Sequence, residues 1–139
     1  MLDFNKYFNE EYQYTLKRAS YTQIEKRRDC DKLELKISDS VDAAVRENCL
    51  EVIFERRVFF KPEALYSIRV CFALTLTFRD TDIARDGKSM DWSTELARSV
   101  NPYLGNVVSR ASSLIAALTS SYGQQPLITP PNVIKMEKM

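Results

Sequence analysis

The sequence contains no histidine, and its three glycines stand far apart. Without histidine, neither a Ser-His-Asp triad nor a Cys-His pair can form, and the commonest metal ligand is missing. Gly87, Gly105 and Gly123 are too dispersed for a phosphate-binding glycine loop, and no P-loop, GxGxxG, GxSxG, HExxH or EF-hand motif occurs. We therefore expect no cofactor, no metal and no enzymatic activity.

The sequence also lacks a charge excess, a long apolar run and paired cysteines. Its 20 Lys and Arg residues balance 19 Asp and Glu residues, whereas nucleic-acid binders usually carry a basic excess. No apolar stretch approaches the roughly 20 residues of a membrane span, and residues 1–14 do not resemble a secretory signal. Cys30, Cys49 and Cys71 form no CxxC pair, which favours free thiols. We expect a cytoplasmic protein that binds no nucleic acid and does not insert into a membrane.

The 139 residues, 45% hydrophobic and 28% charged, are typical of one compact domain with an ordinary core. We place a single domain at residues 14–134, between an N-terminal arm or short helix at 1–13 and a frayed C-terminus at 135–139. Phe4, Tyr7, Phe8 and Tyr12 follow i, i+3, i+4, i+8 spacing, which fits an amphipathic helix. The alternative is an arm whose aromatic side chains dock on the domain.

Alternation of apolar and polar residues predicts four strands. In the last of them, seven apolar side chains occupy every second position, which leaves no room for a helix: Tyr66, Ile68, Val70, Phe72, Leu74, Leu76 and Phe78. The strand before it carries Leu50, Val52, Phe54, Val58 and Phe60 on one face and ends at Pro62, so the two form an antiparallel hairpin. The predicted strands are 14–28, 33–38, 48–60 and 65–79, with a loop at 38–47 that has room for one helical turn at 41–45.

Two helices are predicted after a polar loop at 81–90. Asp91 is a suitable N-cap for a short helix over about 91–99, in which Trp92 and Leu96 share one face. Asn101 and Pro102 begin the main helix, and Gly123 ends it. Its apolar residues recur at helical spacing: Leu104, Val107, Val108, Ala111, Leu114, Ile115, Leu118 and Tyr122. The fold class is therefore α+β, a four-stranded antiparallel sheet followed by a short helix and a long helix that pack on it.

Apolar surface in excess of what one sheet and one helix can cover predicts a binding module rather than an enzyme. The opposite face of the main helix is polar but weakly charged, which favours a helix covered both by its own sheet and by another subunit. The tail at 124–134 contains three prolines and is expected to be extended, packed through Leu127, Ile128, Val133 and Ile134.

The order of these elements resembles the SecB family of export chaperones and their SecB-like relatives. Ala19-Ser20-Tyr21-Thr22 followed by Ile24 is similar to the first strand of the family, and Asn101-Pro102-Tyr103 to the start of its long helix. Val108-Ser109-Arg110 lies within that helix, and the segment from Gln125 to Asn132 is similar to the proline-containing tail. The resemblance covers almost the whole chain from about residue 14.

The resemblance implies a function and an assembly. Members of the family hold non-native polypeptides in apolar grooves without ATP, as homotetramers built from two dimers, with eight-stranded sheets and the long helices at the centre. Clients would be unfolded or nascent polypeptides, bound by burial of their apolar side chains. The groove candidates in this chain are Leu33, Leu35, Ile37, Trp92, Leu96, Leu104, Val108, Ile128 and Val133.

The charge balance leaves the further partner open. Export SecB is markedly acidic and docks the translocase motor through its acidic surface and its C-terminal tail, whereas this chain is neutral and ends in Lys-Met-Glu-Lys-Met. SecB-like proteins also act as dedicated chaperones of antitoxins, so a translocase motor in protein export and an antitoxin are both alternatives. Two other classes stay open: a small α+β ligand-binding domain or enzyme, and an interaction subunit for one fixed partner.

Overall fold

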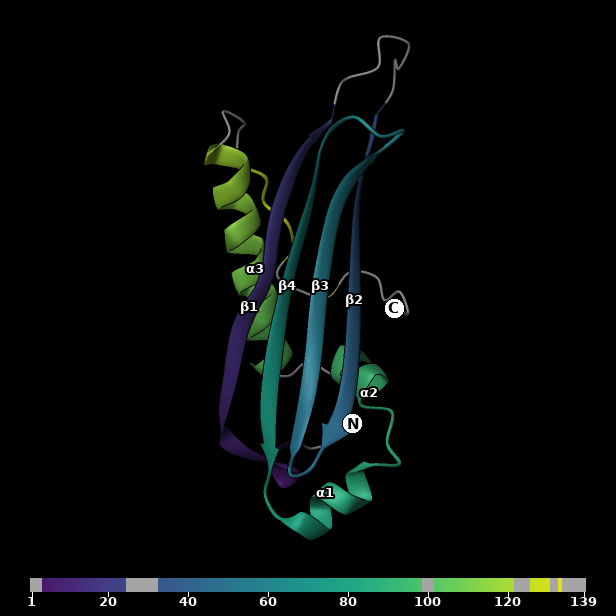
Figure 1. The fold of residues 1–139 in the computed structure, drawn as a ribbon, viewed down its shortest axis with the longest axis vertical. Coiled ribbons are helices and arrows are strands. Elements are labelled where there is room, and N and C mark those ends of the chain that lie inside the picture. Colours follow the sequence, from purple (N-terminus) through teal and green to yellow (C-terminus); the bar gives the residue numbers. More distant parts are fainter. Residues whose placement is uncertain (1–3, 25–32, 99–101, 122–125, 131–132, 134–139) are drawn as a thin grey trace.

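A single antiparallel sheet organises the computed structural model, which describes residues 4–24, 33–98, 102–121, 126–130 and 133 (Figure 1). Within these residues the sheet has four strands in the order β1-β4-β3-β2, so β1 and β2 form its edges. A single 3₁₀ turn, η1, precedes the first strand. The elements of this part are η1 (Phe4–Lys6), β1 (Phe8–Ile24), β2 (Glu34–Arg46), β3 (Cys49–Lys61) and β4 (Leu65–Phe78).

The two central strands form the predicted hairpin, with Leu50 opposite Leu76 and Val58 opposite Ile68. Every second residue of β4 from Tyr66 to Phe78 is buried, while the residues between them are partly or fully exposed. The period of two therefore divides the sheet into a face that carries the core and an outer face. The prediction of an α+β fold with helices packed on an antiparallel sheet is confirmed.

Three helices follow the sheet in the described part: α1 (Thr81–Gly87), α2 (Trp92–Arg98) and α3 (Pro102–Ser121). The carboxylate of Asp91 caps α2, since it accepts hydrogen bonds from the Thr94 backbone N–H and hydroxyl. Helix α3 lies against the core face beside β4 and β1, whereas α2 lies behind β2 (Figure 1). The short and long helices are thus confirmed, while their predicted neighbours Asn101, Tyr122 and Gly123 lie outside the described residues.

The core is apolar along α3 and aromatic at the end of the sheet where β4 finishes. Helix α3 buries Leu104, Val107, Val108, Ala111 and Ile115. Phe8 lies 4.9 Å from Phe78 and 5.2 Å from Trp92 between ring centroids, and Tyr103 adds edge-on contacts with Phe4 and Phe8. Aromatic pairs at these distances stabilise beyond the area they bury.

The N-terminal segment is not the amphipathic helix that one of the two alternatives predicted. Phe8 pairs with Phe78, and the Arg79 backbone N–H donates to the Tyr7 carbonyl at 2.8 Å, so the strand begins here. Phe4 and Phe8 are buried, as the alternative of docked aromatic side chains predicted. The division of the chain at residues 13 and 134 stays a prediction, and the ends at 1–3 and 134–139 lie outside the described residues.

Two segments predicted as loops are regular elements. β2 continues through residues 38–46 because each of its residues there pairs in register with β3, and this pairing outweighs the weak strand preference of Ser, Asp and Ala. Glu47 and Asn48 form the turn, with Glu47 at φ 53°. Within 81–90, α1 forms because the Asp80 carboxylate accepts the Ile83 backbone N–H at 2.8 Å. The predicted strand end at 25–28 lies outside the described residues.

The buried N-terminal aromatics lead to a first prediction. Phe8→Ala should destabilise the protein by about 3–5 kcal/mol, because it leaves a cavity among packed rings. Leu16→Ala, at an exposed position of the same strand, should cost less than about 1 kcal/mol. Urea unfolding measures both, and equal losses for the two variants would show that the N-terminal residues are not part of the core.

Candidate functional site

The nine predicted groove residues do not form one exposed surface. Four of them are buried in the core, namely Trp92, Leu96, Leu104 and Val108. Leu33 is partly buried, and Ile37 and Val133 pack partly buried against the core. Only Leu35, 40% exposed, and Ile128, 77% exposed, present large apolar surfaces. A role of the nine in client binding stays a prediction.

Exposed apolar side chains lie on both edges of the sheet. Leu16 on β1 pairs with Phe72, and Leu35 on β2 pairs with Phe60, so both leucines are on the face that carries the helices. Beyond them, the outer backbone groups of β1 and β2 have no strand partner in the described part of the chain. An edge of this kind can pair with an added extended segment.

The buried charge pair of Arg56 and Asp39 was missed in the sequence. Both side chains are fully buried, and the two residues face each other across β3 and β2. Arg56 Nε donates to Asp39 Oδ1 and Nη2 donates to Asp39 Oδ2, each at 2.7 Å. This two-point geometry is the strongest form of an arginine–carboxylate contact. A buried pair of this kind needs further partners to offset desolvation of the charges.

Those partners come from α3 and from the tail. Arg56 Nη1 donates to the hydroxyls of Ser112 and Thr129, each at 2.9 Å, and to the Pro130 carbonyl at 2.6 Å. The Ser112 hydroxyl also donates to the Pro130 carbonyl. Further along α3, Thr119 Oγ1 accepts the Leu127 backbone N–H at 2.8 Å. One guanidinium therefore joins two strands, the long helix and the tail.

The alternation of side chains along β3 could have revealed the buried pair of Arg56 and Asp39. Arg56 occupies the same alternate positions as Phe54 and Val58, the apolar face of a strand that was correctly predicted. An arginine at such a position requires a buried acid, because an unpaired charge is not tolerated in a core. Asp39 could not be named as that acid, since residues 38–47 were predicted to be a loop.

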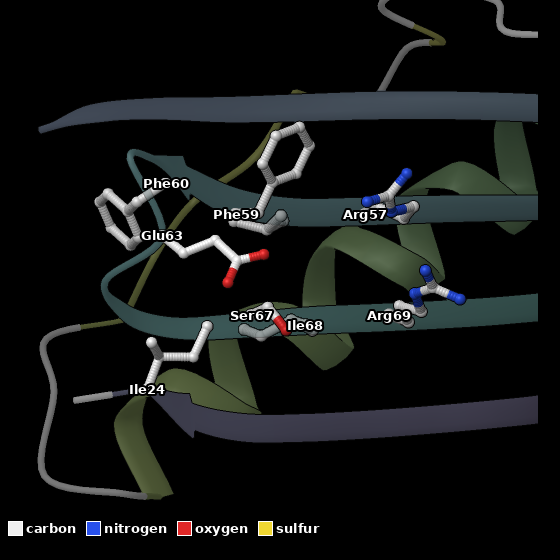
Figure 2. Close-up of a pocket in the computed structure, with 9 residues that line it drawn as sticks. Ile24, Arg57, Phe59, Phe60, Glu63, Ser67, Ile68 and Arg69 are labelled. Carbon is white, nitrogen blue, oxygen red and sulfur yellow. The ribbon is translucent and has the colours of Figure 1, made fainter.

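A cavity of about 180 Å³ opens on the outer face, near the β3–β4 turn (Figure 2). The Arg57 and Arg69 guanidinium groups lie at one end of it, and the Glu63 carboxylate lies between Phe59 and Ser67. The complete lining is Ile24, Arg57, Val58, Phe59, Phe60, Glu63, Ser67, Ile68 and Arg69. Nothing in the alternation pattern distinguished these residues beforehand, because cross-strand neighbours depend on the register of the sheet.

Two cysteines lie in the described part of the chain. Cys49 and Cys71 are free thiols, and burial, together with the nearby Glu55 carboxylate, raises the pKa of Cys71 above its ordinary value. Across the described ranges, no group of His, Cys, Asp and Glu side chains is arranged to hold a metal ion. In the same ranges, no helix combines the length and hydrophobicity needed to cross a membrane.

This arrangement of sheet, helices and tail is the fold of SecB-like chaperones. The structure is similar to the Mycobacterium tuberculosis SecB-like chaperone Rv1957, solved in complex with a ChAD peptide from the antitoxin Rv1956 HigA1. The two align with a TM-score of 0.58 over 86% of this chain and 89% of that chain, at 10% sequence identity. No family model and no curated protein matches the sequence. The comparison therefore establishes a shared fold.

The buried pair leads to a second prediction. Arg56→Met should destabilise the protein by about 3–5 kcal/mol, because it leaves the Asp39 carboxylate buried without its charge partner. Arg46→Met removes the exposed contact to Glu51 and should cost less than about 1 kcal/mol. In urea unfolding, the double variant Arg56→Met with Asp39→Leu should recover part of the loss. A full additive loss in the double variant would contradict a coupled pair.

The environment of Cys71 leads to a third prediction. Because its raised pKa lowers the thiolate fraction near neutral pH, iodoacetamide should alkylate Cys71 more slowly than an unstructured cysteine peptide at pH 7.5. The rate should still be rising at a pH where the peptide has reached its plateau. Peptide mapping by mass spectrometry measures the rate, and a plateau at the same pH as the peptide would contradict the assigned environment.

Proposed function

We propose that the chain is an ATP-independent holdase chaperone that binds non-native polypeptides. The observation that carries this proposal is the fold, which matches a SecB-like chaperone over most of both chains, and that neighbour was solved with a bound peptide. Holding a client requires only that its apolar side chains and backbone find partners, so the proposal assigns no catalytic residue. Burial at about 25 cal/mol per Å² of apolar surface supplies binding free energy without nucleotide.

The tail and the β2 edge are the client surface in this proposal. Thr129 is buried against Arg56 and Leu127 is anchored to Thr119, while Ile128 between them is 77% exposed. The Arg56 network thus holds an apolar side chain toward solvent in a fixed backbone. Such preorganisation reduces the ordering cost of binding. Leu35 supplies a second exposed apolar side chain on an edge that has no strand partner among the described residues, and an extended client can add main-chain hydrogen bonds there.

The assembly and the cellular partner belong to the same proposal. We infer a dimer or homotetramer, supported by the weakly charged outer side of α3, where Asn106, Ser109, Ser113 and Ser120 are exposed. A dedicated chaperone of an antitoxin is the second candidate, favoured by the antitoxin peptide bound to the neighbour. A role in protein export through a translocase motor has weaker support, because the chain carries a net charge of +1. Both roles place the protein in the cytoplasm.

Aggregation of an unfolded client tests the function. The purified chain, mixed at equimolar ratio with urea-denatured citrate synthase and no nucleotide, should delay light scattering after dilution. Ile128→Asp and Leu35→Asp should each weaken this protection severalfold, because a charge replaces an exposed apolar contact. Ser89→Asp adds the same charge at an exposed position after α1 and should protect like the unchanged protein. Undelayed aggregation in the presence of the unchanged protein would refute the proposal.

Native mass spectrometry distinguishes the alternatives. A general holdase should be a dimer or tetramer when purified alone and should bind several unrelated unfolded polypeptides. A dedicated chaperone should protect one small partner and fail with the others. A monomer that protects no client and binds a small molecule would instead favour the α+β ligand-binding alternative.

A further inference from the structure

Two arginines face each other on the outer side of the sheet. Arg57 on β3 pairs directly with Arg69 on β4, and like charges at such positions destabilise an antiparallel pair. Arg69 Nε lies 4.0 Å from Glu55 Oε1, a long contact. The Arg57 guanidinium lies over the Phe59 ring, 5.1 Å from its centroid, and forms no ion pair with any described residue. Arg69 therefore has one long contact with a carboxylate, and Arg57 has none among the described residues.

Hydroxyl groups extend this pair into a row across the sheet. Ser20 on β1 pairs with Arg69, and Ser38 on β2 pairs with Arg57, so the four side chains lie in the order Ser20, Arg69, Arg57, Ser38. Ser38 is 6% exposed, and its Oγ has no hydrogen-bond partner among the described residues. A hydroxyl that is buried without a hydrogen-bond partner costs stability.

Further charged side chains lie beside this row. Arg18 pairs with Cys71, the next outer-face residue of β4, and both Lys17 and Arg18 act on the Cys71 thiol as nearby cations. Glu55 is the carboxylate that opposes them at this point. Two guanidinium groups on facing strands are suited to hold a carboxylate between them.

The cavity beside the two arginines indicates which kind of side chain would bind next to a carboxylate held there (Figure 2). Phe59 and Ile24 give it apolar walls, while the Glu63 carboxylate repels a second acidic group. Arg57 and Phe59 are two residues apart on one strand, and side chains two apart in an extended peptide have the same spacing. The site thus fits an acidic residue followed two positions later by an apolar one.

We propose that this outer face binds an acidic, extended segment of a partner polypeptide, with one carboxylate held between Arg57 and Arg69 and an apolar side chain in the cavity. A protein segment is favoured over nucleic acid because Glu55 and Glu63 flank the site and would repel a continuous row of phosphates. The site lies on the face opposite Leu35 and the helices, so it does not depend on the proposed client surface.

Peptide binding to the full chain tests the site. The probe is a fluorescein-labelled octapeptide, Ser-Glu-Ser-Leu-Ser-Glu-Ser-Leu, measured by fluorescence anisotropy at 50 mM salt. Arg57→Gln and Arg69→Gln should each weaken binding about tenfold, since each removes a charge-assisted contact. Arg46→Gln is the matched control, because Arg46 lies on the same face but already contacts Glu51 at 2.8 Å. It should bind the peptide like the unchanged protein.

Two further probes test whether the site recognises a carboxylate and whether it prefers a peptide to a nucleic acid. The same peptide with Gln in place of Glu should bind at least tenfold more weakly, and oligothymidylate of equal charge should not compete. Equal binding of the Gln peptide, unchanged binding by both arginine variants, or tighter binding of oligothymidylate at this site would each overturn the proposal. These outcomes are independent of client aggregation, so failure here leaves the holdase proposal standing.

Urea unfolding of Ser38→Ala and Arg57→Gln separates binding from folding. Without its unpaired hydroxyl, the free protein should unfold at the same or a higher urea concentration than the unchanged chain, and it should bind the acidic peptide equally well because this oxygen is buried away from the peptide. Arg57→Gln should likewise not lower the unfolding midpoint, because it relieves repulsion from Arg69. Destabilisation by both variants, with peptide affinity unchanged in Arg57→Gln, would assign the row a structural role and contradict the site.

Discussion

The buried contact between Arg56 and Asp39 is the constraint on which the arrangement of this chain depends. Two full charges removed from water are tolerated only when the geometry is close and every remaining donor is used. Asp39 supplies both carboxylate oxygens, and Ser112, Thr129 and Pro130 accept from the third nitrogen. The sheet, the long helix and the tail must therefore come together for this guanidinium to have all of these partners.

The two faces of the sheet carry different kinds of side chain. On the helix face, β4 and α3 bury a continuous apolar layer, and the tail closes over Arg56 with Ile128 left exposed. On the outer face, Ser20 and Ser38 flank the Arg57 and Arg69 pair, and Glu55 and Phe59 lie beside it. The proposed client surface lies on the first face and the proposed site for an acidic segment lies on the second, so the two proposals concern separate surfaces.

Local signals predicted the elements whose side chains alternate or repeat without interruption. The seven alternating residues of β4 and the apolar spacing of α3 gave correct elements because each pattern is contained within its own segment. The second half of β2 was predicted to be a loop because Ser40, Asp42 and Ala44 favour strands only weakly. Their pairing with β3 stabilises the strand, but it cannot be recognised from the sequence of β2 alone. The N-terminal aromatics fitted a helical period by chance, while their real partners Phe78 and Trp92 are some seventy or more residues away.

The candidate site was predictable only in part for the same reason. Trp92, Leu96, Leu104 and Val108 were groove candidates implied by the family resemblance, but these apolar residues are buried in the core. The exposure of Leu35 and Ile128 depends on where the sheet ends and where the tail is anchored, neither of which is encoded locally. Arg56 did carry a local signal, a charge on the apolar face of a strand, whereas the pairing of Arg57 with Arg69 required the register of the hairpin.

Site-specific crosslinking tests the central claim, that this domain binds non-native polypeptide through its exposed tail and sheet edge. A photoreactive benzoylphenylalanine at position 128 or 35, irradiated with urea-denatured citrate synthase just diluted from denaturant, should crosslink to the client. The same group at position 89 should give little product, and folded citrate synthase should give none at any position. Equal crosslinking from all three positions, or equal crosslinking to folded and unfolded client, would contradict the account.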